Sequence, residues 1–153
     1  MPRKKKPISK WDQRFIDLAE FILGWSKDPN SKVGAVVVTN EGGAIALEYN
    51  GFPAGIEDDE RLDNRDLKLD MIIHAEQNAL IIAGTQAKGA SLYVWGKPIC
   101  ARCAVIIIQA GIDRIIAVNP EDEIDKDSEW IEPGKLAMKM FREAGKNIIY
   151  YIP

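Results

Sequence analysis

The feature that most constrains this chain is the placement of its metal-binding residue types. Its 153 residues include a single histidine and two cysteines. The histidine lies in the segment His74-Ala75-Glu76, and two residues separate Cys100 from Cys103. One imidazole and two thiolates suit a zinc ion whose fourth position stays open, as in catalytic rather than structural zinc sites. We therefore expect a fold that brings His74 to the cysteine pair, with Glu76 close enough to carry protons.

Three other interpretations of these residues fit the sequence less well. A thioredoxin-like redox pair would leave His74 and Glu76 without a role, and no tryptophan directly precedes Cys100. A structural zinc site needs a fourth ligand, and no further Cys or His is present, so only an Asp or Glu could close it. Unrelated core positions would require every Cys and His of the chain to take this spacing by chance. A catalytic zinc site is the favoured interpretation.

A His-x-Glu followed by a Cys-x-x-Cys is typical of zinc-dependent nucleobase deaminases, in which the glutamate is an acid/base and not a ligand. We predict that His74, Cys100 and Cys103 hold Zn²⁺ and that Glu76 is catalytic. Both His74 and Cys100 stand where a predicted helix begins, so free N–H groups favour thiolates and a nearby oxyanion there. Residues two apart do not share a helix face, so the zinc must lie off the end of the helix for His74 and Glu76 both to reach it.

Composition indicates one globular domain. The apolar fraction is 46%, the charged fraction 28% and the net charge −3, which disfavours a surface for nucleic acid. No apolar run reaches membrane-helix length, so no membrane partner is expected, and two reduced cysteines suit the cytoplasm. Residues 1–9 contain the basic run Arg3 to Lys6 and are predicted to form a disordered tail, although a nucleic-acid arm or targeting tag remains open. Residues 10–153 form the predicted domain.

The order of predicted elements indicates an α/β fold. Helical spacing and β-branched runs alternate after an opening hairpin, and residues 51–71 lack a usable period and are expected to be structureless. Helices are predicted at 11–25, 73–83, 100–110 and 130–144, and strands at 33–38, 44–49, 91–95, 114–118 and 148–152. This pattern favours a mixed sheet covered on both faces, a three-layer α/β/α sandwich.

Several longer segments resemble the deoxycytidylate (dCMP) deaminase family of the cytidine deaminase superfamily. They follow the family's order between about Trp25 and Ile112. They are Ser26-Lys27-Asp28-Pro29-Asn30-Ser31-Lys32-Val33-Gly34-Ala35, Tyr49-Asn50-Gly51-Phe52-Pro53-Ala54-Gly55, His74-Ala75-Glu76-Gln77-Asn78-Ala79, Cys100-Ala101-Arg102-Cys103-Ala104 and Ile107-Ile108-Gln109-Ala110-Gly111-Ile112. The resemblance implies hydrolysis of dCMP to dUMP, a five-stranded cytidine deaminase-like fold and assembly into homo-oligomers, from dimers to hexamers.

The resemblance also implies substrate contacts. Asn50 would bind the sugar, and Ser26, Lys27 and Asn30 would lie on the phosphate side, with Ala75 completing the set. Asn50 as a turn residue before glycine and Lys27 as a solvated lysine are the alternatives.

Three departures from the family pattern affect these expectations. Ile99, and not proline, directly precedes Cys100, so the pocket near the zinc is expected to be lined differently. Glu48 replaces the glycine of a segment associated with activation by dCTP and inhibition by dTTP, and its charge would repel a triphosphate, so that allostery is expected to be absent or altered. The loop 119–128 is strongly acidic, and if it borders the pocket it favours a substrate without phosphate.

The alternatives in function are a deaminase for a nucleoside, free base or other aminated heterocycle, an editing deaminase, and a non-catalytic module. An editing enzyme needs a basic groove for the phosphates of single-stranded nucleic acid, which the acidic balance disfavours.

Overall fold

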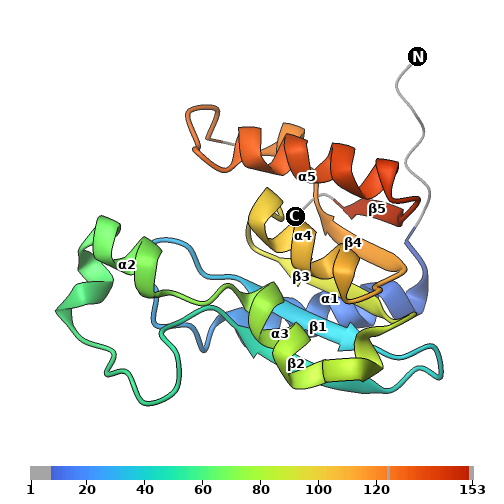
Figure 1. Ribbon diagram of the computed structural model, residues 1–153, viewed down its shortest axis with the longest axis horizontal. Helices are drawn as coiled ribbons and strands as arrows, with labels where there is room; N and C mark the ends of the chain where they lie inside the picture. Colours follow the sequence, from blue (N-terminus) through green and yellow to red (C-terminus); the bar gives the residue numbers. More distant parts are fainter. Residues whose placement is uncertain (1–7, 124, 152–153) are drawn as a thin grey trace.

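The computed structural model describes residues 8–123 and 125–151, which form one sheet packed between helices (Figure 1). The strands are β1 (Gly34–Val38), β2 (Ala44–Tyr49), β3 (Ser91–Trp95), β4 (Arg114–Val118) and β5 (Asn147–Tyr151). The helices are α1 (Lys10–Leu23), α2 (Arg65–Met71), α3 (Ala75–Ala83), α4 (Ala101–Gln109) and α5 (Ile131–Glu143). Short 3-10 turns occupy η1 (Glu60–Asp63), η2 (Gly84–Ala87) and η3 (Pro120–Asp122). None of these helices is long and apolar enough to cross a membrane.

The sheet is mixed, with strand order β2-β1-β3-β4-β5. β1 pairs antiparallel with β2, as the predicted hairpin requires, and antiparallel with β3. β3, β4 and β5 are mutually parallel and are joined through α4 and α5. The predicted five-stranded mixed sheet is therefore confirmed.

Side chains that alternate along the strands divide the core into two layers. On β1, Ala35 and Val37 belong to the core layer that also contains residues of α3, α4 and α5, whereas Val36 and Val38 belong to the layer with α1 on the opposite face. β1 is buried along its whole length, which explains its β-branched sequence. At Gly34 a side-chain methyl group would overlap the backbone carbonyl of Ala19, so glycine permits the close approach of α1. The three-layer α/β/α prediction is confirmed.

A partly buried ion pair joins α1 to the sheet. Both carboxylate oxygens of Asp12 accept hydrogen bonds from the Arg114 guanidinium, one at 2.7 Å and one at 3.0 Å. The Tyr93 hydroxyl donates to the same carboxylate at 2.6 Å. Burial alone would raise the pKa of Asp12, but the hydrogen bonds from Arg114 and Tyr93 outweigh it and lower that pKa.

The expectation that residues 51–71 lack regular structure is wrong. Asp59 and Asn64 cap two short helices, η1 and α2, by accepting hydrogen bonds from the backbone N–H groups of Arg61 and Leu67. α2 stands at one end of the molecule, away from the sheet (Figure 1).

The predicted tail of residues 1–9 lies mostly outside the described residues. Its last two members belong to the folded part, since Ile8 packs on the core and Ser9 caps α1 by accepting from the Asp12 N–H.

Candidate metal centre and active site

The three predicted zinc ligands lie together. The His74 Nδ1 atom is 3.1 Å from the Cys103 Sγ atom and 3.6 Å from the Cys100 Sγ atom. All three ligand atoms lie within 4.8 Å of one another. Tetrahedral zinc with Zn–N near 2.0 Å and Zn–S near 2.3 Å places a nitrogen and a sulfur ligand about 3.5 Å apart. The side chains are therefore already spaced to hold zinc.

The ends of two helices produce this spacing. His74 is the N-cap of α3 and Cys100 is the N-cap of α4, both in extended backbone conformation. The His74 N–H donates to the Gln77 side chain at 2.9 Å, which ties the chain to the first turn of α3. Cys103 follows one turn into α4. The N-terminal end of a helix carries a partial positive charge, which favours negative charge at His74 and Cys100.

The two cysteine thiols differ in how readily they lose a proton. A hydrogen bond with the Cys103 thiol lowers the pKa of Cys100 to about 4, and the same bond, with burial, raises the pKa of Cys103. A hydrogen bond with Cys100 raises the pKa of His74. A metal ion takes up thiolates and a neutral imidazole, so zinc binding releases protons here.

Glu76 is buried beside these ligands. Burial raises the pKa of its carboxyl group, although the neighbouring His74 opposes that effect. A raised pKa makes the carboxylate a stronger base than an exposed glutamate, which suits a group that must accept a proton and later return it.

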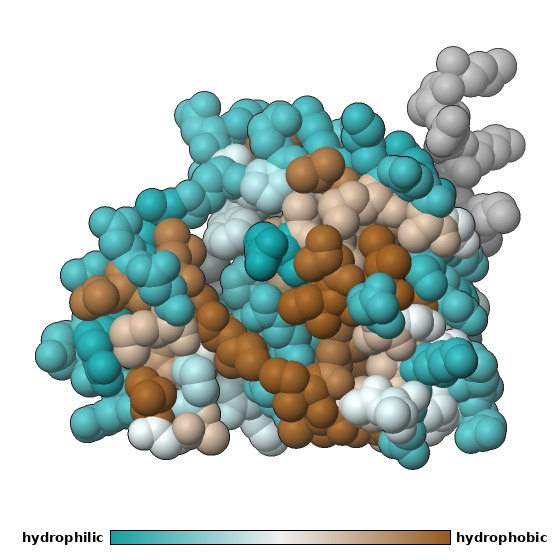
Figure 2. All heavy atoms as spheres, viewed as in Figure 1, coloured by the Kyte–Doolittle hydropathy of each residue, from teal (hydrophilic) through white to brown (hydrophobic). Residues whose placement is uncertain are grey.

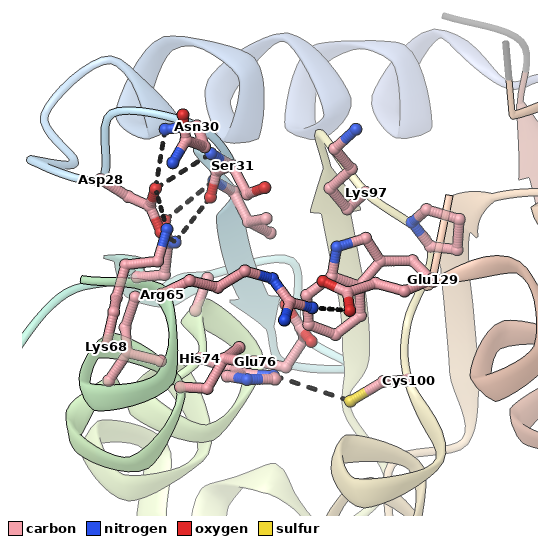
Figure 3. Close-up of a pocket in the computed structure, with 17 residues that line it drawn as sticks. Asp28, Asn30, Ser31, Arg65, Lys68, His74, Glu76, Lys97, Cys100 and Glu129 are labelled. Carbon is pink, nitrogen blue, oxygen red and sulfur yellow. Dashed lines mark hydrogen bonds and ion pairs between the residues drawn. The ribbon is translucent and has the colours of Figure 1, made fainter. Parts of the chain in front are cut away.

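A cavity of about 280 Å³ opens above the ligands (Figure 3). His74, Glu76 and Cys100 line it, together with side chains from α2 and from the segments around β1, β3 and α5. Trp130 closes one wall, its ring lying edge-on to the His74 ring with centroids 6.1 Å apart. The cavity has the size of a small-ligand site.

Three cationic side chains line the cavity, and each is paired with a carboxylate. Arg65 of α2 pairs with Glu129, which precedes α5, and the two meet across the cavity in Figure 3. Lys68 pairs with Asp28 at 3.1 Å. Lys97 pairs with Glu123 at 3.6 Å. The cavity therefore offers positive charge only where an existing pair is exchanged.

Of the five predicted substrate contacts, three line the cavity: Asn50, Asn30 and Ala75. Ser26 is buried outside the lining, where its hydroxyl donates to the Asn50 carbonyl at 2.8 Å. Lys27 is exposed and also lies outside the lining.

The Asn50 side chain is largely occupied by the protein. Its amide donates to the Ser31 carbonyl at 2.7 Å and to Asp28 Oδ2 at 3.4 Å. Its oxygen accepts from the Val33 N–H at 2.9 Å. The amide oxygen keeps one lone pair, so Asn50 can offer a ligand an acceptor but not a donor.

The structure shows where the three departures from the family pattern lie relative to the cavity. Ile99 is buried in the core, whereas Pro98 lines the cavity. Glu48 accepts a hydrogen bond from Asn78 of α3 at 3.0 Å, and burial raises the pKa of Glu48. The acidic loop reaches the cavity indirectly, through the pairing of Glu123 with Lys97.

Several residues of the cavity were not foreseen as functional. In the sequence, Asp28 is only a member of the family-like segment Ser26 to Ala35, and no motif singles out the cations Arg65, Lys68 and Lys97. The cap at Asn64 was the available signal for α2 and its cations.

Comparison with known proteins agrees with this geometry. The model of the family described as "Cytidine and deoxycytidylate deaminase zinc-binding region" matches residues 9–119. A protein of Aliivibrio fischeri named "Uncharacterized deaminase in luxG 3'region" is 37% identical over 94% of this chain and 95% of its own. Human deoxycytidylate deaminase is 35% identical over 99% of this chain and 85% of the human protein.

Solved structures show the same fold. The apo dCMP deaminase of cyanophage S-TIM5 superposes with a TM-score of 0.71 at 23% identity, covering 95% of this chain and 100% of that one. RibD of Acinetobacter baumannii gives a TM-score of 0.66 at 24% identity, covering 94% of this chain and 36% of RibD. The cytidine deaminase-like fold expected from the sequence is confirmed.

Proposed function

Because this chain belongs to the cytidine and deoxycytidylate deaminase family, we propose that it is a zinc-dependent hydrolase that converts dCMP and water to dUMP and ammonia. The observation that carries this proposal is the buried Glu76 carboxyl group beside the His74, Cys100 and Cys103 group at the base of a small-molecule cavity. The near full-length relation to human deoxycytidylate deaminase supports the choice of substrate.

The ligand residues hold the metal in this proposal, and Glu76 moves the protons. Zinc, when bound, supplies a Lewis acid that makes water nucleophilic at neutral pH. Glu76 accepts a proton from the attacking water and delivers it to N3 of the cytosine ring. It then takes the remaining proton from the new hydroxyl group on C4 and passes it to the departing amine. A C4–O bond forms and the C4–N bond breaks, so ammonia leaves and uracil remains.

The remaining residues of the cavity orient the nucleotide. Asn50 accepts a hydrogen bond from a sugar hydroxyl, and Asn30 and Ala75 contact the substrate from the rim and from the start of α3. Ser26 acts through Asn50, whose carbonyl accepts its hydrogen bond. Lys27 is exposed outside the cavity lining and contributes only long-range positive charge.

A second candidate is a deaminase of a nucleoside, free base or other uncharged heterocycle. The pairing of Arg65, Lys68 and Lys97 with carboxylates favours it, because a phosphate must displace a carboxylate to reach any of these cations. Rates on dCMP, deoxycytidine and cytosine separate the two candidates.

We also propose that the protein acts in the cytoplasm as a homo-oligomer. Two thiols that must stay reduced to bind metal suit a reducing compartment. Exposed apolar side chains form a patch over α3 and α4 (Figure 2). The patch consists of Ile81, Ile82, Val105 and Ile106. A contiguous apolar surface of this kind is typical of an interface. Light scattering of the purified protein measures the assembly.

The decisive experiment measures ammonia release from dCMP by the zinc-loaded protein and by Glu76→Gln. We expect turnover in the wild type and a loss of about 10²–10⁴-fold in the variant, with the zinc content unchanged. Glu143→Gln on the exposed end of α5 makes the same chemical change outside the cavity and should keep full activity. Full activity of Glu76→Gln would refute the assignment of Glu76, and turnover only on unphosphorylated substrates would establish the second candidate.

A further inference from the structure

The three ion pairs of the cavity differ in how readily their cation can be released. The Lys68 and Asp28 side chains are 8% and 2% exposed. Asp28 also accepts from the Asn30 N–H at 2.9 Å and the Ser31 N–H at 3.0 Å, which fixes its carboxylate in place. A ligand cannot take Lys68 without leaving Asp28 as a buried uncompensated charge. This pair is structural.

Lys97 is only partly available to bind a ligand. Its side chain is 31% exposed, but its partner Glu123 is 12% exposed and anchored in the segment after η3. Its distance of 3.6 Å from Glu123 makes this a loose pair, and a single ammonium offers no fixed geometry to a planar or tetrahedral anion.

Arg65 is the cation that a ligand can recruit. Its side chain is 59% exposed and that of Glu129 is 50% exposed, so water competes for both and the pair is weak. The two residues come from opposite walls, α2 and the segment before α5, and both line the cavity. In Figure 3 the Arg65 side chain extends over His74 and Glu76 to reach Glu129.

The chemistry of the two partners favours exchange. A guanidinium group donates parallel hydrogen bonds to two oxygens of a phosphate as readily as to a carboxylate. A phosphate monoester near neutral pH carries more negative charge than one carboxylate, so it competes well for the same pair of guanidinium N–H donors.

We propose that Arg65 selects substrates that carry a 5′-phosphate, by leaving Glu129 and binding the phosphate, while Glu129 competes with the phosphate and limits its affinity. This inference rests on the proposed function, since it assigns the substrate class of that same cavity. Glu129 thus keeps Arg65 at the mouth of the cavity when no nucleotide is bound.

The test compares binding of the product dUMP with binding of deoxyuridine by calorimetry, on zinc-loaded protein. We expect Arg65→Gln to weaken dUMP binding about ten- to a hundredfold and deoxyuridine binding by less than about twofold. Arg65→Lys keeps the positive charge but lacks the two parallel N–H donors, so its affinity for dUMP should lie between those of the wild type and Arg65→Gln. Glu129→Gln should tighten dUMP binding about two- to fivefold, and this gain should vanish when Arg65 is also replaced.

Arg61→Gln is the matched control. Arg61 lies nearby on η1, pairs with Asp59 at 2.8 Å and lies outside the cavity lining, so both ligands should bind as in wild type. In turnover assays Arg65→Gln should raise KM for dCMP with little change in kcat. Far-UV circular dichroism and Tm establish that each variant is folded.

The role of Arg65 and the proposed deaminase reaction can fail independently of each other. Equal losses for dUMP and deoxyuridine in Arg65→Gln would show a merely structural role and overturn the inference, even in an active deaminase. A gain from Glu129→Gln that persists without Arg65 would overturn the exchange. Absence of ammonia release from dCMP, with dUMP preference still dependent on Arg65, would refute the proposed reaction and uphold the phosphate contact.

Discussion

Replacing Lys68 with methionine should destabilise the protein through a charge that is left behind. Methionine fills a similar volume but leaves the buried Asp28 carboxylate without its cation, 3.1 Å away in the wild type. Removing one partner of a buried pair costs about 3–5 kcal/mol. Asp28 retains hydrogen bonds from the Asn30 and Ser31 N–H groups and from Asn50, so we expect the lower end, about 3 kcal/mol.

For a domain of this size that loss lowers Tm by about 6–12 °C, measured by scanning calorimetry of zinc-loaded protein. Lys135→Met is the control, because Lys135 forms only an exposed pair with Glu132 at 3.5 Å on α5, and its Tm should stay within about 2 °C of the wild type. Adding Asp28→Asn to Lys68→Met removes the unpaired charge and should recover part of the loss. A Tm of Lys68→Met as close to wild type as that of the control would refute the reasoning.

The remaining predictions concern the core, acid stability and the metal. Gly34→Ala forces a methyl group into the Ala19 carbonyl and should cost about 1–3 kcal/mol or more in urea unfolding; wild-type stability would show that α1 can shift. The pKa of Asp12 is lowered by Arg114, so its stabilising effect is complete above its unfolded pKa and is lost as pH falls from there through the folded pKa. Asp12→Asn should therefore unfold at lower Tm at pH 7 but lose less stability than the wild type below about pH 4. Cys103→Ser should lose most of its zinc by elemental analysis, and stoichiometric zinc would contradict its role as a ligand.

The zinc group and the sheet could be predicted because each has a local cause. A chain with one histidine and two cysteines has a single His/Cys/Cys set, and the N-caps at His74 and Cys100 follow from the segments that precede them. β1 and β4 are short, largely β-branched runs that are buried along nearly their whole length, which is typical of central strands.

The walls of the cavity could not be predicted in the same way, because their causes are not local. Lys68 meets Asp28 across 40 residues of sequence, and Arg65 meets Glu129 across 64. No periodicity relates such partners. α2 itself has seven residues, too few for a helical period to stand out.

The position of α2 places the proposed phosphate contact of Arg65 apart from the residues of the metal centre. The metal ligands and Glu76 lie in the first turns of α3 and α4, beside the central core. Arg65 projects from a short peripheral helix that makes no part of the sheet (Figure 1). We therefore expect substitutions at Arg65 to change which molecules bind while the reaction at the metal centre stays intact.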